Sequence, residues 1–132
     1  MRQTLVLIAM LAAPAALAEE TPMTADEFDA YATGKILTYA DGGTVWGTEH
    51  YKPDRRVVWA FTDSECRTGY WYEQDDQICF VYEDPNDPQC WWFYRREGGI
   101  AARFVGDPEG ITLSEVAQSD GPMPCAGPDL GA

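Results

Sequence analysis

The four cysteines are the residues of this sequence whose chemistry is most constrained. They lie at Cys66, Cys79, Cys90 and Cys125. Zinc is one use of four cysteines, but its sites usually contain a Cys-x-x-Cys pair, which this sequence lacks. The single histidine, His50, is also remote from the cysteines in sequence. The N-terminal segment predicts export to an oxidising compartment, where an even number of cysteines instead predicts two disulfides, and we expect no metal site.

Four cysteines allow three pairings, and their spacing alone does not choose among them. Two considerations favour Cys79 with Cys90 and Cys66 with Cys125. The first pair closes a short polar loop that contains prolines and joins two strand-like segments. The second pair ties down residues 118–132, which have too little apolar content to hold themselves in place. Strand alternation puts the first pair on one face only if the connection has a bulge or an odd number of residues.

Residues that could catalyse a reaction are sparse. A nucleophile would have to rely on His50 as its base, and the chain has no Gly-x-Ser-x-Gly motif and, with two disulfides, no free cysteine. Neighbouring carboxylates such as Asp75-Asp76 and Glu83-Asp84 fall in predicted turns. Solvent keeps both members of such a pair ionised, which removes the difference in pKa that acid–base catalysis requires. We therefore expect that the protein is not an enzyme.

The segment from Glu83 to Pro88 is where oxygen ligands crowd together. A hard cation such as calcium accepts carboxylate-rich loops, but this segment lacks the ligand periodicity and the central glycine of an EF-hand. Turn chemistry favours a solvated loop whose acidic side chains hydrate its turns and prolines. We therefore expect no metal and no other cofactor.

Aromatic side chains are the remaining candidates for a binding site, with 5 Trp, 7 Tyr and 5 Phe in 132 residues. Large rings let a small domain bury enough apolar area, at about 2–3 kcal/mol for each fully covered ring. The same rings can line a ligand groove, where their polar atoms orient the ligand. The core interpretation is favoured, and a cluster exposed on one face would favour the groove. The candidate groove residues are Trp46, Tyr70, Tyr72, Trp91 and Trp92.

The N-terminal segment has the three parts of a secretory signal peptide. Arg2 provides a positive start, Leu5–Ala13 is an apolar run, and Ala16–Ala18 is a small-x-small cleavage site. The apolar run is shorter than the ~20 residues that a membrane-spanning helix needs. We therefore expect that residues 1–18 are removed, and that a soluble chain beginning at Glu19 works in the periplasm or outside the cell.

The protein is strongly acidic, with a formal net charge of -13. Loss of Arg2 with the signal peptide leaves eight basic residues against 22 acidic ones, a net charge of -14. Such a charge repels nucleic-acid phosphates and anionic lipid headgroups, so neither is an expected partner. One interpretation of the acidic residues is that they are dispersed and keep an exported domain soluble. The alternative interpretation is that they form an acidic surface for a cationic partner or a metal ion. The length fits a single domain, which we place at 19–117 with a tail at 118–132, and we expect a monomer.

A short helix is predicted at residues 24–33. Its first residue, a threonine, has capping-box spacing with Glu27, and Met23 and Phe28 have the spacing of a hydrophobic staple. Gly34 is placed to end the helix. We expect the helix to plug or cover one end of a sheet. The residues of its apolar stripe are Phe28, Tyr31 and Ala32.

From Lys35 onward, short aromatic and β-branched runs alternate with turn residues, which is typical of an antiparallel all-β domain. Turns such as Asp41–Gly43 and Gln74–Gln77 supply residues that accept positive φ. We predict a mainly β fold, in which a meander of about eight strands curls into a barrel-like sheet and so removes exposed edges. An open sheet or a sandwich is the alternative. The predicted strands are Lys35–Ala40, Thr44–Tyr51, Arg56–Phe61, Gly69–Glu73, Ile78–Tyr82, Trp91–Arg96, Ile100–Val105 and Ile111–Val116.

Alternation along the strands predicts which side chains share a face. Val57, Trp59 and Phe61 would lie together on one face of their strand. The run Trp91–Tyr94 has bulky rings at four successive positions, so large rings occupy both faces of that strand. Some of these rings must therefore pack beneath the helix or the tail, or remain exposed.

Four segments of the chain resemble a known family. Tyr51–Trp59, Gly69–Tyr72, Ile78–Tyr82 and Cys90-Trp91 resemble a group of small exported bacterial proteins, mainly alphaproteobacterial, that carry no assigned function. The resemblance covers most of the chain after the signal peptide and implies a periplasmic location. Its motifs are turns, core rings and cysteines, so it implies no catalytic residue. Periplasmic lysozyme inhibitors and small barrel inhibitors of secreted metalloproteases are similar in general build, although the Ser-Gly-x-x-Tyr loop of the first group is absent.

We therefore expect a non-enzymatic periplasmic domain that binds or inhibits a partner, for example by presenting its acidic surface to a cationic protein such as a lysozyme. One alternative is a calycin-like carrier of small ligands with an aromatic-lined cavity. Another is a structural component of the cell envelope. A packed interior with rings on its rim favours the partner-binding domain, and an open cavity favours the carrier.

Overall fold

The computed structural model describes residues 20–62, 65–106, 110–123 and 125. The predicted signal peptide, residues 1–18, lies outside the described residues, as does segment 126–132 of the predicted tail. Within the described part, one helix, α1 (Ala25–Ala32), is followed by eight strands, and a 3-10 turn at Pro53–Arg55 joins two of them. The strands are β1 (Ile36–Asp41), β2 (Thr44–Lys52), β3 (Arg56–Phe61), β4 (Arg67–Gln74), β5 (Gln77–Val81), β6 (Gln89–Arg96), β7 (Gly99–Phe104) and β8 (Thr112–Ser119).

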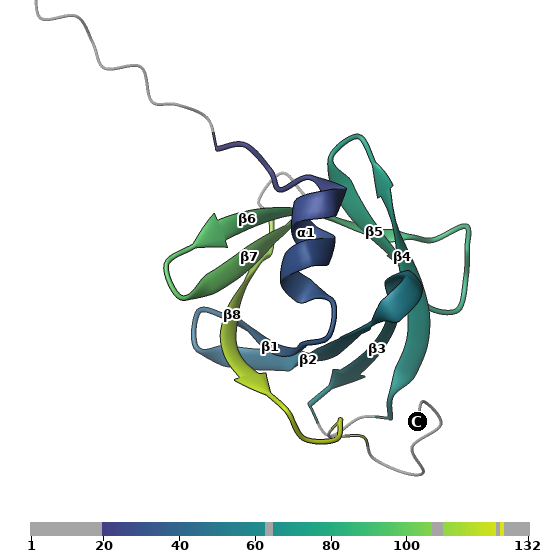
Figure 1. Ribbon diagram of the computed structural model, residues 1–132, viewed down its shortest axis with the longest axis vertical. Helices are drawn as coiled ribbons and strands as arrows, with labels where there is room; N and C mark the ends of the chain where they lie inside the picture. The colour runs from purple at the N-terminus through teal and green to yellow at the C-terminus, as the bar shows by residue number, and fades with distance from the viewer. Residues whose placement is uncertain (1–19, 63–64, 107–109, 124, 126–132) are drawn as a thin grey trace, which may run out of the picture.

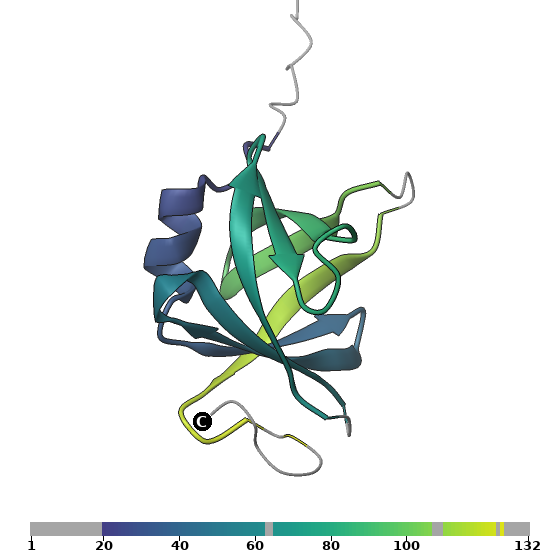
Figure 2. The ribbon, with the colours of Figure 1, turned by 90° about the vertical axis from the view of Figure 1, so that its right-hand side faces the viewer.

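The strands form a closed antiparallel barrel in which each strand pairs with the next along the chain. Pairing of β1 with β8 closes the ring. The predicted meander of eight strands, curled into a barrel with one short N-terminal helix, is confirmed. Figures 1 and 2 together show α1 lying over one end of the ring of strands.

Helix α1 begins and ends where its sequence signals predict. The Thr24 hydroxyl accepts a hydrogen bond from the Glu27 backbone N–H at 3.2 Å, and the Glu27 carboxylate accepts one from the Thr24 N–H at 3.1 Å. Hydrogen bonding of the Glu27 carboxylate to Thr24, first to its backbone N–H and then to its side chain, lowers the pKa of Glu27. After the helix, Gly34 adopts a φ of +92°, and its N–H donates to the Tyr51 carbonyl at 2.7 Å. The chain thus turns directly from α1 into the barrel.

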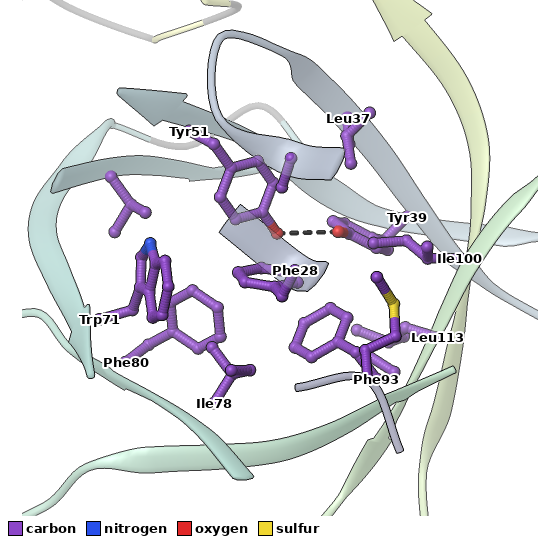
Figure 3. Close-up of a cluster of buried hydrophobic side chains, with 14 of the residues drawn as sticks. Phe28, Leu37, Tyr39, Tyr51, Trp71, Ile78, Phe80, Phe93, Ile100 and Leu113 are labelled. Carbon is purple, nitrogen blue, oxygen red and sulfur yellow. Dashed lines mark hydrogen bonds between the residues drawn. The ribbon is translucent and has the colours of Figure 1, made fainter. Parts of the chain in front are cut away.

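The side chain of Phe28 inserts from α1 into the centre of the barrel. It is fully buried, and Figure 3 shows it surrounded by rings from several strands. The ring centroids lie 4.5–6.4 Å away, which is the usual range for contacting aromatic pairs. The helix therefore fills one end of the barrel with a plug that belongs to the main core. The rings around Phe28 are Tyr51, Trp71, Phe80 and Phe93.

Both predicted disulfides, Cys79–Cys90 and Cys66–Cys125, are present. Cys79 lies directly opposite Cys90 in the pairing of β5 with β6. The sequence reasoning required a bulge or an odd number of residues in the connection, and that requirement is wrong. Pairing continues to Phe80 opposite Gln89 without a register shift, and directly opposed residues always share a face.

Strand β8 extends beyond its predicted end at Val116. Its last residues pair with the start of β1, where Ser119 lies opposite Ile36 and Gln118 opposite Leu37. Backbone pairing does not require apolar side chains, so the polar composition of this segment concealed its strand structure. The barrel therefore includes residues that the sequence assigned to the tail.

Replacing Phe28 with alanine should lower the free energy of unfolding by about 3–5 kcal/mol, because the void left among four rings cannot close completely. Phe61 provides the matched control, since its side chain is 41% exposed at the other end of the barrel. Phe61→Ala should cost about 1 kcal/mol or less. Urea unfolding followed by tryptophan fluorescence, with the disulfides intact, measures both values. Equal losses would contradict the role of Phe28 as the plug.

Candidate functional site

The barrel contains a cavity of about 430 Å³ at the end opposite α1. Helix α1 is tied to the end of β2 through the bond from Gly34 to Tyr51, whereas the cavity reaches Trp46 near the start of β2 and Phe61 at the end of β3. Its floor is the outer layer of the core, because six lining residues also belong to the buried cluster. These floor residues are Tyr39, Tyr51, Phe80, Phe93, Ala102 and Leu113.

Five aromatic side chains form the walls near the mouth of the cavity. They come from β2, β3, β6 and the loop that joins β5 to β6, and closure of the barrel brings them together. Four of them are partly buried against the core, and Phe61 is more exposed. A ligand in the cavity would therefore contact ring faces on several sides. We call these residues the mouth rings: Trp46, Trp59, Phe61, Tyr82 and Trp91.

A β-bulge directs Trp46 into the cavity. Tyr39 lies opposite Gly47 and Ala40 lies opposite Val45, so Trp46 is the extra residue of β2 at this point. Strict alternation would put Trp46 on the face opposite to Gly47 and therefore outside the barrel. The extra residue shifts the alternation by one, as bulges commonly do near sites.

Gly47 makes room for a second tryptophan. A Cβ atom at this position would lie 2.6 Å from the Trp59 ring and would also clash with the Ala60 carbonyl of β3. The absence of a side chain thus allows the Trp59 ring to lie close against β2. Trp59 also contacts Phe61 edge to face, with ring centroids 5.3 Å apart.

Glu49 is a buried carboxylic acid in the cavity wall, and only 2% of its surface is exposed. It lies between inward-facing residues, opposite Leu37 on β1 and Trp59 on β3. The Tyr82 hydroxyl donates a 2.7 Å hydrogen bond to Oε1, whereas Oε2 has no partner among the described residues. Burial raises the pKa of Glu49 to about 8, against the opposing effect of the bond from Tyr82.

Charged residues surround the mouth of the cavity unevenly. Glu83, Asp84 and Asp87 line it from the loop between β5 and β6, and Arg67 lines it from the start of β4. The guanidinium of Arg67 lies 5.7 Å from the centroid of the Phe61 ring. The lining is therefore predominantly acidic. Deeper in the cavity, the hydroxyls of two floor tyrosines, Tyr39 and Tyr51, hydrogen-bond to each other at 2.8 Å (Figure 3).

The structure separates the five aromatic residues predicted to form a groove. Trp46 and Trp91 line the cavity, whereas the other three are not part of its lining. Tyr70 and Tyr72 flank the inward-facing Trp71 and so lie on the outer face, where Tyr70 is 47% exposed. Trp92 alternates in the same way between two inward-facing residues of β6. The predicted face of Val57, Trp59 and Phe61 does point inward.

Sequence reasoning missed Glu49, Trp59 and Tyr82 as site residues. One signal for Glu49 was available, because it lies two residues before Tyr51 in a predicted strand and so shares the face of a large ring. An acidic residue at an inward-facing position is unusual and often has a function. The contact between Glu49 and Tyr82 depends on barrel closure, which local patterns do not reveal.

The other residues considered for chemistry lie apart from one another. His50 is half-buried and is not part of the cavity lining, and burial together with the charge of Lys52 lowers its pKa. Among the described residues, no group of three or more His, Cys, Asp or Glu side chains is arranged to hold a metal ion. Part of the acidic segment from Glu83 to Pro88 instead forms the mouth of the cavity.

Comparisons with known proteins identify no relative. The chain matches no protein-family model, no curated protein and no solved structure. In the part of the chain that the structure describes, no helix has the length and apolar character needed to cross a membrane.

The stability of the protein should contain a component that decreases as the pH rises, because folding raises the pKa of Glu49. This carboxyl titrates near 4.5 when exposed and near 8 in the folded chain. Its contribution to the free energy of unfolding is fully present below about pH 4.5. As the pH rises from about 4.5 to about 8, this contribution is lost at up to ~1.4 kcal/mol per pH unit. Glu49→Gln removes the titration, so the variant should gain stability relative to the parent as the pH rises. Urea unfolding of both proteins at pH 5, 7 and 9 tests this, and a pH-independent difference would contradict it.

Proposed function

We propose that this protein binds a small molecule with an apolar body inside the barrel, as a carrier or receptor of the calycin-like type. The observation that carries the proposal is the cavity, which is lined by the mouth rings and contains a buried, half-satisfied carboxyl at Glu49. Cavities of roughly 300–1,000 Å³ that combine apolar walls with a few polar groups are typical of small-ligand sites.

Packing alone does not account for the end of the barrel that contains the cavity. The end under α1 is filled by Phe28 and its ring neighbours, as expected of a core that contributes only to stability. The opposite end contains as many large rings, yet they surround about 430 Å³ of open space. A cavity-lining polar group with an unpaired oxygen has a cost in stability, which is commonly tolerated where the group binds a ligand.

The open cavity favours the carrier over a protein inhibitor, for which a filled interior with rings on an outer rim was expected. The location that we propose is the periplasm or the exterior of the cell, after loss of residues 1–18. Support comes from the two disulfides, Cys66–Cys125 and Cys79–Cys90, because such bonds persist in oxidising compartments.

Binding of the neutral fluorescent probe N-phenyl-1-naphthylamine tests the proposed site. Trp91→Ala should weaken binding by about tenfold, because a ring contact of this kind is worth about 1.4 kcal/mol. Trp92→Ala is the matched control, since Trp92 is the next residue of β6 and is not part of the cavity lining. Its affinity should stay within about twofold of the parent protein. Titration followed by probe fluorescence gives both dissociation constants.

Two results of this experiment would contradict the proposed binding site. If the parent protein shows no saturable binding of the probe, or if Trp92→Ala weakens binding as much as Trp91→Ala, the cavity is not the binding site. Circular dichroism and urea unfolding of both variants show whether each retains the barrel. This comparison separates loss of a ligand contact from loss of the fold.

A further inference from the structure

We propose that the cavity selects cations: its ligand carries a protonated amine on a ring-sized apolar body, and the amine binds the free oxygen of Glu49. This proposal rests on the proposed function and specifies its ligand class. It requires an acidic group in the cavity wall that a cation can ionise, cation-compatible walls and an entrance that does not repel cations. The structure provides each of these.

The carboxyl of Glu49 is positioned to accept a donor from a ligand. Tyr82 occupies Oε1 at 2.7 Å, and Oε2 is buried in the cavity wall without a partner among the described residues. An unpaired buried oxygen costs more than a hydrogen bond gains, so a ligand that donates to Oε2 removes a penalty as well as forming a contact. The bond from Tyr82 holds the carboxyl in place before binding and so reduces the conformational cost.

The walls around Glu49 favour a positive charge. Three of the mouth rings are tryptophans, Trp46, Trp59 and Trp91, whose ring faces carry partial negative charge. Indole attracts ammonium ions more strongly than the other aromatic side chains do, especially in desolvated sites. The same rings can therefore contact the apolar body of the ligand and stabilise the charge of its ammonium group.

The charges at the entrance also favour a cation. Glu83, Asp84 and Asp87 line the mouth, against the single lining cation Arg67 among the described residues. Electrostatic steering by such a rim raises the local concentration of cations and lowers that of anions. Fatty acids and other carboxylates are therefore disfavoured, although the apolar walls alone would accept them.

Proton release distinguishes this proposal from a neutral alternative. With its pKa raised to about 8, Glu49 is mostly protonated at pH 7 in the free protein, and it could then donate to a ligand carbonyl instead. An ammonium ion stabilises the ionised carboxylate, so its binding should release a proton below about pH 8, whereas a neutral acceptor should release none. Other titratable or charged groups also face this part of the cavity. They are Tyr39, Tyr51, Arg67, Tyr82, Glu83, Asp84 and Asp87. Three of these are tyrosines whose pKa values burial raises well above 10, so they do not titrate in this range.

Calorimetric titration with three probes of matched shape tests the selectivity. The probes are 2-phenylethylammonium, 2-phenylethanol and 3-phenylpropanoate. At pH 8 and low salt the ammonium should bind at least about tenfold more tightly than the alcohol, and the propanoate should bind more weakly than either. From pH 8 down to pH 6 the affinity for the ammonium should fall by up to about tenfold per pH unit, because less of Glu49 is ionised.

Glu49→Gln is the decisive variant, because glutamine has the same shape and can still accept the bond from Tyr82 but carries no charge. It should lose at least about tenfold in affinity for the ammonium at pH 8, and its affinity should no longer depend on pH. Glu73→Gln, at an exposed position at the other end of β4, removes the same charge and should leave the affinity unchanged within about twofold. Equal effects of the two variants would overturn the proposal.

The neutral naphthylamine probe separates the two levels of inference. If the probe binds but the alcohol or the propanoate binds as tightly as the ammonium, selection of cations is wrong and the small-ligand function stands. If neither the probe nor the ammonium binds, the proposed function itself is wrong. Retention of probe binding by Glu49→Gln shows that the variant is folded, so weaker ammonium binding then reports on the carboxylate.

Discussion

Closure of the barrel encloses an interior, and Phe28 fills only one end of it. The phenyl ring enters from α1 and contacts rings from four strands, so the helix and the barrel share one core. The side chains of a small barrel either fill its interior completely or leave room for one small ligand. Here the plug makes one end solid, and the tryptophans at the other end line a cavity instead of closing it. The position of the helix thus decides which end of the barrel remains available for binding.

The Cys79–Cys90 disulfide connects this architecture to the chemistry of the site. It joins β5 to β6 just before and after the connecting loop, and that loop carries Tyr82 and acidic residues of the cavity mouth. Tyr82 in turn holds the carboxyl of Glu49 from across the barrel. A covalent link at the base of the loop limits how far these groups can move. The disulfide therefore supports the orientation of the site as well as the stability of a small domain.

The buried carboxyl of Glu49 has a cost in stability that the proposed function would explain. Burial disfavours its ionised form and raises its pKa to about 8. A neutral side chain of similar size would remove that cost, and the proposed ammonium ligand gives the acid a role that offsets it. In the proposed complex, the same environment would strengthen the interaction of the carboxylate with a cation, because little water competes inside the cavity.

The sequence by itself determined the local elements of this protein, and the tertiary structure decided the site. Capping residues around Thr24, turn residues such as Asp75, and apolar alternation act over a few positions, so the helix and the eight strands were predictable. The two disulfide pairings followed from a different argument, namely the short loop that Cys79–Cys90 closes and the polar tail that Cys66–Cys125 ties down. The site depends on interactions between distant segments. The bulge that turns Trp46 inward is set by the register of β2 against β1, and the partnership of Glu49 with Tyr82 exists only after the strands have closed into a ring. Register and closure reflect packing of the whole interior, which no short window of the sequence contains.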